Sequence, residues 1–386
     1  MIRDLILLAI SLFVWGVGES AFFAFQPLYL EQLGADPLRI GAIIGSYGLA
    51  ATLAHVPAGY LSDRFGRRPL LWAAWIIGLL STGLMALAET LPVFVAGMLI
   101  YSMTMFVVVP LNSYVAAASG KYSVGRLLTL VSASYNAGAI LGPLLGGLIG
   151  ELSGYQMIFK FAAGLFFFST VIILFIRKQP IDAPHAEDKR TNLFKNQRYL
   201  YFIGVYLLST FAMYLPQPLS PNFLQSERSF SLTQIGQLYS INSVGIVTLN
   251  LILGQLDVRL GYLIGQIAVG LFALLLWKRT SLPWNLSAYF LLGGYRAARS
   301  LAVAYIRTTV SGSNMGLAFG LAETMTALAL FLSPPLAGYL YNQDPVRVYQ
   351  VSLVMIAISL LANLLLFNGL KATQPIDPPA SAEELA

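Results

Sequence analysis

The stretch Gly59-Tyr60-Leu61-Ser62-Asp63-Arg64-Phe65-Gly66-Arg67-Arg68-Pro69 joins two long apolar segments, Ile40 to Leu61 and Leu70 to Leu87. Each segment approaches the length of about 20 apolar residues that a helix needs to cross a bilayer. Basic residues alone would hold such a loop on the cytoplasmic side of a membrane. Here an acid, Asp63, lies among the bases and between two glycines, which let the backbone approach a neighbour closely. The spacing therefore predicts a tight loop in which Asp63 meets the positive N-terminus of another helix.

Composition places the whole chain in a membrane. Of its 386 residues, 57% are hydrophobic and 10% are charged, whereas a soluble domain carries about 25% charged residues. There is no cysteine, and the two histidines, His55 and His185, are far apart, so we expect no disulfide, metal site or cofactor. We also expect no enzyme activity, because the sequence offers no nucleophile–base or metal-binding constellation.

Apolar segments of spanning length predict twelve transmembrane helices. We expect them at residues 5–30, 40–61, 69–88, 91–116, 126–149, 156–176, 200–224, 232–256, 259–277, 284–308, 316–340 and 347–369. The only long polar segment inside the chain follows the sixth helix. The sequence therefore predicts an N-terminal six-helix bundle (1–177), a cytoplasmic linker (178–199), a C-terminal six-helix bundle (200–370) and a disordered cytoplasmic tail (371–386).

The basic residues indicate the orientation. Most of the 23 lysines and arginines fall at one set of ends of these segments, the set that includes Arg3, the loop around Arg64, and the central linker. The positive-inside rule then places both termini in the cytoplasm, with the chain crossing the inner (plasma) membrane several times. The net charge of +6 is explained as an orientation signal, so no nucleic-acid partner is needed to account for it.

Two motifs occur twice, at nearly the same separation. Gly254-Gln255-Leu256-Asp257-Val258-Arg259-Leu260-Gly261 repeats the glycine–arginine–glycine spacing of Gly59, Arg64 and Gly66 195 residues later, with its acid displaced by one position. Pro335-Leu336-Ala337-Gly338 echoes Pro143-Leu144-Leu145-Gly146 192 residues later. Because two unrelated motifs give nearly one offset, we expect the two halves to be structural repeats with a binding site between them.

The first stretch resembles the loop signature G-x-L-x-D-R-x-G-R-K/R of the major facilitator superfamily. The segment Gly138 to Gly147 is similar to the G-x3-G-P-x2-G-G pattern of the drug/proton antiporters in that superfamily, although the fourth helix lacks the arginine that many of them carry. The resemblance implies an all-α membrane protein with twelve transmembrane helices in two pseudo-symmetric six-helix bundles. It also implies conformational gating by Gly59, Asp63, Arg64, Gly66, Arg67, Gly142, Pro143, Gly146 and Gly147. In this reading Asp63 meets the start of helix eleven near Ser313-Asn314.

Ionisable residues deep in the spans are few. A charge at the bilayer centre costs about 2.5–3.5 kcal/mol and is usually paired and functional. Helices one, four, seven and ten line the cavity in the superfamily, which puts Glu19 opposite Arg296 and Arg299, with Glu323 as a partner for Arg299. The predicted substrate- or proton-binding residues are Glu19, Gln26, Asn112, Tyr295, Arg296, Arg299 and Glu323. The alternative is a set of fixed ion pairs that holds the halves together.

These features predict a secondary active transporter that moves a small organic solute by alternating access. Proton-coupled export by a monomer in the lipid bilayer is the leading hypothesis. An importer or facilitator of an anionic or sugar-like solute is the alternative that the arginine pair favours. A transport-inactive membrane sensor is the alternative from a different class of protein.

Overall fold

The computed structural model describes residues 2–118, 122–178, 193, 196–310 and 315–369, and it describes the backbone alone for residues 2, 52, 54–65, 109, 315, 316, 368 and 369. All regular elements in these ranges are helices. The predicted tail and most of the predicted linker lie outside them, so the boundaries of the two bundles remain a prediction.

Nine helical stretches in the described ranges are long and apolar enough to cross a bilayer. They are formed by α1 (Ile2–Phe23), α4 (Arg67–Leu87), α5 to α6 (Leu91–Ser102, the 3-10 turn η1 at Met103–Val107, and Val108–Ala117), α7 (Val124–Ser153), α8 (Tyr155–Leu174), α11 (Leu232–Leu253), α12 (Val258–Lys278), α15 (Met315–Gln343) and α16 (Arg347–Gly369). The other three predicted segments are also helical. They are α3 (Pro37–Phe65), α9 and α10 (Gln197–Tyr214 and Ser220–Ser226), and α13 and α14 (Leu282–Leu292 and Gly294–Thr309).

Four segments are interrupted, and the interruptions come in matching pairs. α1 gives way to α2 (Gln26–Gln32) at Gln26-Pro27-Leu28, and α9 gives way to α10 around Gln217-Pro218-Leu219, 191 residues later. The breaks at Ser102 and Gly293 are separated by the same offset. Proline lacks an N–H and clashes with the preceding turn, which explains the first pair. The matched breaks are what two repeats of one fold would produce, and they fall in the first, fourth, seventh and tenth segments.

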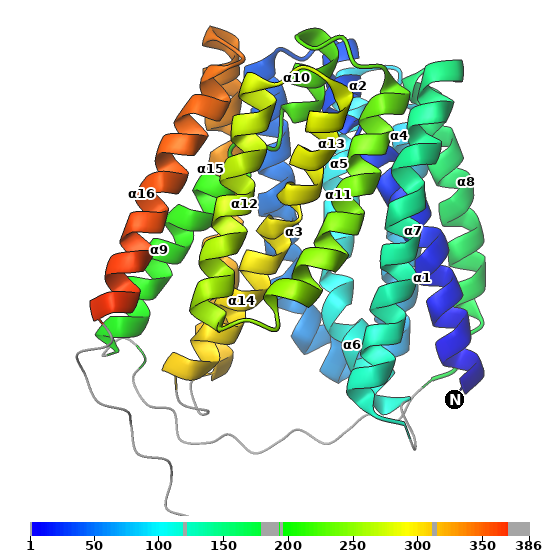
Figure 1. Cartoon of the computed structure of the whole chain (residues 1–386). Helices are drawn as coiled ribbons and strands as arrows, with labels where there is room; N and C mark the ends of the chain where they lie inside the picture. Colours follow the sequence, from blue (N-terminus) through cyan, green and yellow to red (C-terminus); the bar gives the residue numbers. More distant parts are fainter. Residues whose placement is uncertain (1, 119–121, 179–192, 194–195, 311–314, 370–386) are drawn as a thin grey trace, which may run out of the picture.

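The helices run side by side in one bundle (Figure 1). α1 begins and α16 ends at one end, here called the base, and α2 and α10 lie at the opposite end, the apex. In the first half, α1 packs on α7 and α8, and α4 packs on α8; in the second, α12 packs on α14 and α16, and α9 on α15. The halves meet mainly along two pairs, α3 with α15 and α7 with α11.

Glycines bring the halves close together toward the apex. A β-carbon on Gly41 would lie 2.2 Å from the carbonyl oxygen of Pro334, and one on Gly147 would lie 2.5 Å from that of Leu232. The hydrogen bonds that join the halves within the described ranges run from mid-height to the apex. They include Ser243 Oγ to the Ala139 carbonyl (3.0 Å) and Tyr155 Oη to Gln225 Oε1 (2.8 Å). The structure is therefore closed at the apex.

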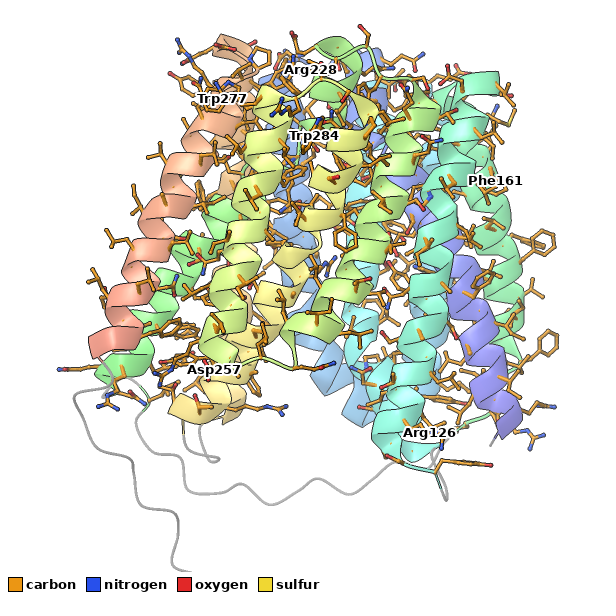
Figure 2. The ribbon with its side chains drawn as sticks, viewed as in Figure 1. Arg126, Phe161, Arg228, Asp257, Trp277 and Trp284 are labelled. Atoms are coloured by element: carbon orange, nitrogen blue, oxygen red, sulfur yellow. The ribbon has the colours of Figure 1, made fainter. Side chains whose placement is uncertain are left out.

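Charged side chains lie at both ends of the bundle, with Arg228, Trp277 and Trp284 near the apex and Asp257 and Arg126 at the base (Figure 2). Near the apex, Arg228 donates to the carbonyl oxygens of Leu276 and Trp277, and Lys278 lies over the Trp277 ring at 3.6 Å. Between the ends, large apolar side chains such as Leu80 (66% exposed) and Leu365 (61% exposed) point outward. Apolar sides with aromatic and basic rims are typical of a bundle that sits in lipid.

The stretch that opened the sequence analysis is more helical than predicted. α3 continues to Phe65 and α4 starts at Arg67, so a single residue, Gly66, makes the turn with φ of 82°. Glycine adopts this left-handed region without strain, which makes a longer loop unnecessary. In the second copy, Asp257 accepts from the backbone N–H groups of Arg259 and Leu260 at 3.0 and 3.3 Å. Asp257 therefore caps α12, which gives a local reason for its displacement by one position relative to Asp63.

Candidate functional site

A buried carboxylate lies at mid-height in the first half. Glu19 on α1 is only 8% exposed. The Tyr135 hydroxyl of α7 donates to Glu19 Oε2 at 2.7 Å, and Trp15 and Tyr101 lie beside the carboxylate. The close approach of the helices follows from Gly16, where a β-carbon would lie 2.4 Å from the Tyr135 carbonyl oxygen. The sequence around Glu19 thus brings α7 near enough to hydrogen-bond it.

Tyrosines that the sequence analysis did not select surround this carboxylate. Tyr47 of α3, Tyr101 of α5 and Tyr135 of α7 all interact electrostatically with Glu19. The Trp15 and Tyr101 rings stack with centroids 6.2 Å apart. The Tyr47 hydroxyl is buried and has no hydrogen-bond partner among the described residues. Unpartnered buried hydroxyls are uncommon in folded proteins, so this region has polar groups to offer a ligand.

The second half contributes an accessible arginine. Arg296, in the first turn of α14, is exposed and forms no salt bridge within the described part of the chain. It interacts electrostatically with Glu19 and Tyr135 across the interface and with Tyr214 of its own half. Arg296 therefore lies within electrostatic range of the first half, and its side chain is exposed.

Two more tyrosines line the same side of the site. The Tyr214 and Tyr295 rings lie 5.9 Å apart, where α9 ends and α14 begins. Tyr295 is 7% exposed, and its hydroxyl has no hydrogen-bond partner among the residues described. Both helix breaks, at Pro216 and at Gly293, thus place a tyrosine next to Arg296. We call Glu19, Tyr47, Tyr101, Tyr135, Tyr214, Tyr295 and Arg296 the central site.

Arg299 and Glu323 form the ion pair suggested by the sequence. Arg299 Nη2 lies 2.5 Å from Glu323 Oε2, and the two side chains are 29% and 55% exposed. The hydroxyls of Tyr206 and Thr326 are hydrogen-bonded at 2.8 Å next to this pair. The structure thus distinguishes the two predicted arginines, since Arg299 forms a salt bridge with Glu323 and Arg296 forms none among the described residues. A fixed ion pair describes Arg299 and Glu323 but not the central site.

The remaining predicted binding residues are Gln26 and Asn112. Gln26 is 4% exposed at the break that starts α2, and its Nε2 has no hydrogen-bond partner in the described ranges. Asn112 is exposed on α6. Neither forms a hydrogen bond to a member of the central site among the residues that the structure describes.

Two faces of the glycine-rich segment of α7 pack closely against two different helices. β-Carbons on Gly142 and Gly146 would lie 2.4 and 2.1 Å from the carbonyl oxygens of Val17 and Ala21 on α1. Gly147 faces Leu232 of α11, and a β-carbon on Gly236 would lie 2.3 Å from the Pro143 carbonyl oxygen. Small residues allow this close packing of helices in lipid. The motif joins α7 both to its own half and to the other half.

The first gating motif is described only in part. Gly66 makes the turn, and Arg67 is the first residue of α4. Gly59, Asp63 and Arg64 belong to the part of α3 whose backbone alone is described. The partner predicted for Asp63, Ser313-Asn314, lies outside the described residues, so this contact remains a prediction.

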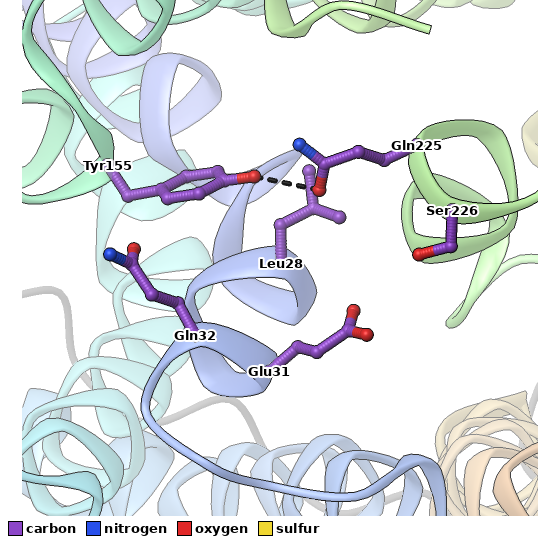
Figure 3. A pocket seen from close by; sticks show the side chains of 6 residues that line it. All are labelled: Leu28, Glu31, Gln32, Tyr155, Gln225 and Ser226. Carbon is purple, nitrogen blue, oxygen red and sulfur yellow. Dashed lines mark hydrogen bonds between the residues drawn. The ribbon is translucent and has the colours of Figure 1, made fainter. Parts of the chain in front are cut away.

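A separate pocket opens at the apex (Figure 3). It has a volume of about 380 Å³ and is lined by Leu28, Glu31, Gln32, Tyr155, Gln225 and Ser226. Asn222 of α10 donates to Glu31 of α2 and, at 3.3 Å, to the Pro27 carbonyl. The pocket thus lies beside polar contacts that hold the apical ends of the two halves together. No group of three or more potential metal ligands occurs among the described residues.

Comparisons with known proteins agree with this architecture. The sequence model of the Major Facilitator Superfamily matches residues 8–294 and 202–385. Multidrug resistance protein 2 of Bacillus subtilis is 23% identical over 355 residues, which cover 87% of this chain and 88% of that protein. The quinolone resistance protein NorA of Staphylococcus aureus is 21% identical over 374 residues, which cover 89% and 91%. A crystal structure of a mutant of the nucleoside transporter NupG superposes with a TM-score of 0.79 at 18% identity, covering 95% of this chain and 99% of that one.

The family match spans both halves, and the paired helices with their matched breaks have the fold of the superposed transporter. The chain therefore belongs to the major facilitator superfamily, and it is an integral membrane transporter of small molecules rather than an enzyme.

Proposed function

We propose that the chain is a secondary active transporter that exports a small organic solute in exchange for protons. The printed names of two relatives, a multidrug resistance protein and a quinolone resistance protein, favour organic compounds as substrates and export as the direction. Those names describe the relatives. For this chain, the argument rests on the central site.

The observation that carries the proposal is the environment of Glu19. The carboxylate is buried, receives a hydrogen bond from Tyr135 and lies within electrostatic range of the exposed Arg296. Intramembrane carboxylates of this kind commonly take part in proton relays. A proton and the cationic group of a substrate would compete for the same carboxylate. Mutually exclusive binding makes each ligand lower the affinity of the other, which couples their movements in opposite directions.

The aromatic lining favours an organic substrate with a positive group. Trp15 and Tyr101 lie beside Glu19, and the Phe23 and Tyr47 rings lie 6.3 Å apart on the neighbouring helices. Cations are attracted to the faces of such rings, with an energy of about 2 kcal/mol when desolvated. The rings also present apolar area to an organic skeleton.

We propose that transport proceeds by alternating access. The described contacts close the apex, through Gly41 and Gly147 and the Asn222–Glu31 bond, while Arg296 is accessible. The opposite state requires these apical contacts to separate. We propose that the Asp63 motif stabilises this opposite state by holding the two halves together at the base, as a latch. One chain supplies both halves of the site, so a monomer suffices.

We propose that the base faces the cytoplasm and that the chain lies in the cell (inner) membrane. Arg3, Arg68 and Arg126 lie at the base, together with Arg177 and Lys178. An excess of basic residues in short segments is typical of the cytoplasmic side. The proposal also places both termini in the cytoplasm.

Resistance profiling tests the proposal. The wild-type chain, Glu19→Gln and the matched control Glu89→Gln would be expressed in an efflux-deficient bacterium and challenged with a panel of organic cations. Glu89 is exposed in the turn between α4 and α5. We expect resistance with the wild type and Glu89→Gln, loss of resistance with Glu19→Gln, and loss in every strain after addition of a proton uncoupler. Full resistance with Glu19→Gln, or resistance that survives the uncoupler, would reject the proposal.

A second candidate, import or facilitated uptake of an anionic solute, is favoured by Arg296. Arg296 is exposed and lacks a salt-bridge partner within the described residues. An anion bound there would neutralise the positive charge that stabilises ionised Glu19, so the proton would follow the anion in the same direction. Acid-stimulated uptake of an organic anion that is lost with Arg296→Gln would favour this candidate. No transport under either set of conditions would favour a sensor.

A further inference from the structure

Four basic side chains gather around the end of α8 at the base. Arg3 lies in the first turn of α1 and Arg68 in the first turn of α4, while Arg177 and Lys178 follow α8. Arg3, Arg177 and Lys178 are exposed, and Arg68 is half-buried. We call these residues the α8 base cluster. They come from α1, α4 and the end of α8; α1 and α4 each pack on α8, and none of the three belongs to the helix pairs along which the halves mainly meet.

Specific contacts fix this cluster on the last turn of α8. Arg3 Nη2 donates to the Phe175 carbonyl oxygen at 3.5 Å, and Trp72 Nε1 donates to the Ile173 carbonyl oxygen at 3.1 Å. The Arg68 guanidinium lies over the Trp72 ring, 3.9 Å from its centroid. Arg3 and Arg68 therefore converge on the same backbone segment, although they are far apart in sequence.

The described residues leave the positive charge of the cluster largely uncompensated. Among the described residues, Asp4 is the acidic residue in the cluster, and its side chain is only 2% exposed. Asp4 Oδ1 accepts from the Arg177 backbone N–H at 3.3 Å and lies 3.8 Å from Arg3 Nη2. Arg68 Nε is buried and has no hydrogen-bond partner among the described residues. A buried guanidinium donor without an acceptor indicates a missing anionic or polar partner.

The surface next to the cluster is apolar. Ile6 of α1 is 52% exposed, Leu174 of α8 is 39% exposed and Phe175 is 65% exposed. They lie within a turn or two of the basic residues at the ends of two neighbouring helices. Cationic groups at the rim of a bilayer and apolar side chains just inside it match the two ends of a phospholipid. An orientation signal needs only positive charge in a loop, and it does not require Arg68 to stack on Trp72 with a free Nε donor.

We propose that the α8 base cluster is a binding site for the headgroup of an anionic phospholipid. The phosphate lies between Arg3 and Arg68, with Arg177 and Lys178 adding attraction, and the acyl chains lie along Ile6 and Phe175. Basic pockets between transmembrane helices on the cytoplasmic side bind anionic headgroups in this way. None of its helices belongs to the pairs along which the halves mainly meet, so the site is independent of the central site and of what that site transports.

Lipid binding to the purified full chain tests the proposal. Native mass spectrometry and thermal unfolding would be measured after addition of dioleoyl phosphatidylglycerol, dioleoyl phosphatidylcholine or inorganic phosphate. The variants are Arg3→Gln, which removes an exposed side chain, the double variant Arg3→Gln/Arg68→Gln, and Arg126→Gln as the control. Arg126 lies at the foot of α7 and carries the same charge (Figure 2). Each basic side chain at the membrane surface contributes about fivefold to the affinity for anionic lipid.

We expect phosphatidylglycerol to bind and raise the unfolding temperature of the wild type and Arg126→Gln, and phosphatidylcholine and inorganic phosphate to have no such effect. The affinity should fall about fivefold with Arg3→Gln and more than tenfold with the double variant. If the double variant does not fold, the result for Arg3→Gln decides. Equal affinity in Arg3→Gln and the wild type overturns the proposal. Equal stabilisation by inorganic phosphate also overturns it, because the site would then bind a free anion.

Discussion

Replacing Gly147 by alanine tests whether the apical contact between α7 and α11 sets the conformational equilibrium. The new β-carbon would lie 2.5 Å from the Leu232 carbonyl oxygen and 3.1 Å from the Thr233 α-carbon. Favourable non-bonded contacts lie at about 3.5 Å, so the helices must separate by roughly 1 Å. Overpacking of this kind costs about 1–3 kcal/mol. The cost falls on the apex-closed state alone, which should shift the population toward the apex-open state by about 5- to 150-fold.

Gly146→Ala is the matched control for this substitution. Its β-carbon would lie 2.1 Å from the Ala21 carbonyl oxygen, but that contact joins α7 to α1 within one half. Because a half moves as a unit in alternating access, the strain should be the same in both states. We expect Gly146→Ala to lower the unfolding temperature and to leave the conformational equilibrium unchanged.

Electron–electron double resonance measures the difference. The chain contains no cysteine, so spin labels can be attached at Leu152→Cys and Trp284→Cys. These positions lie at the apical ends of α7 and α13, and the native side chains are 76% and 49% exposed. Gly147→Ala should add a population at longer distance, and Gly146→Ala should not. The reasoning is refuted if the two variants give the same distance distribution, or if only Gly146→Ala adds the longer distance.

Three further outcomes are expected. Asn222→Ala removes the bonds to Glu31 and to the Pro27 carbonyl, so it should also raise the apex-open population in the same spin-label assay; an unchanged distribution would show that these bonds do not hold the apex. Exchanging the pair as Arg299→Glu/Glu323→Arg should restore the unfolding temperature that either single change lowers, because the pair is already formed, and failure of the exchange to rescue would argue against a simple ion pair. Asp63→Asn removes a charge–dipole attraction of about 0.3–1 kcal/mol and should slow transport with normal membrane insertion, whereas wild-type turnover would contradict the latch.

Hydrophobic length and proline chemistry made most of the fold predictable. A run of about 20 apolar residues has few alternatives to a spanning helix, so each predicted segment is helical in the structure. Pro216 and Pro218 lie in the break that separates α9 from α10, where proline cannot continue a helix. The predicted loop around Asp63 was too long, because the sequence does not reveal that Gly66 alone completes the turn.

Only the charged residues of the central site could be predicted from the sequence. Glu19 and Arg296 stand out because charges are expensive in a bilayer, and their opposition follows from pairing the halves. Tyrosine carries no such penalty, and its side chain is common both in helix packing and at interfaces. Which of the 20 tyrosines point toward Glu19 depends on how α3, α5 and α7 are rotated. Helix rotation is set by packing, and for that reason Tyr47, Tyr101 and Tyr135 were not identified from the sequence.

Proton movement coupled to solute movement is the most direct test of the proposed exchange at Glu19. The purified chain would be reconstituted in liposomes with a trapped pH-sensitive dye, and a compound identified by resistance profiling would be added outside. The proposed mechanism predicts proton flux opposite to the flux of the compound in the wild type and no proton flux in Glu19→Gln. Solute movement without proton flux, or the same proton flux in Glu19→Gln, would contradict it.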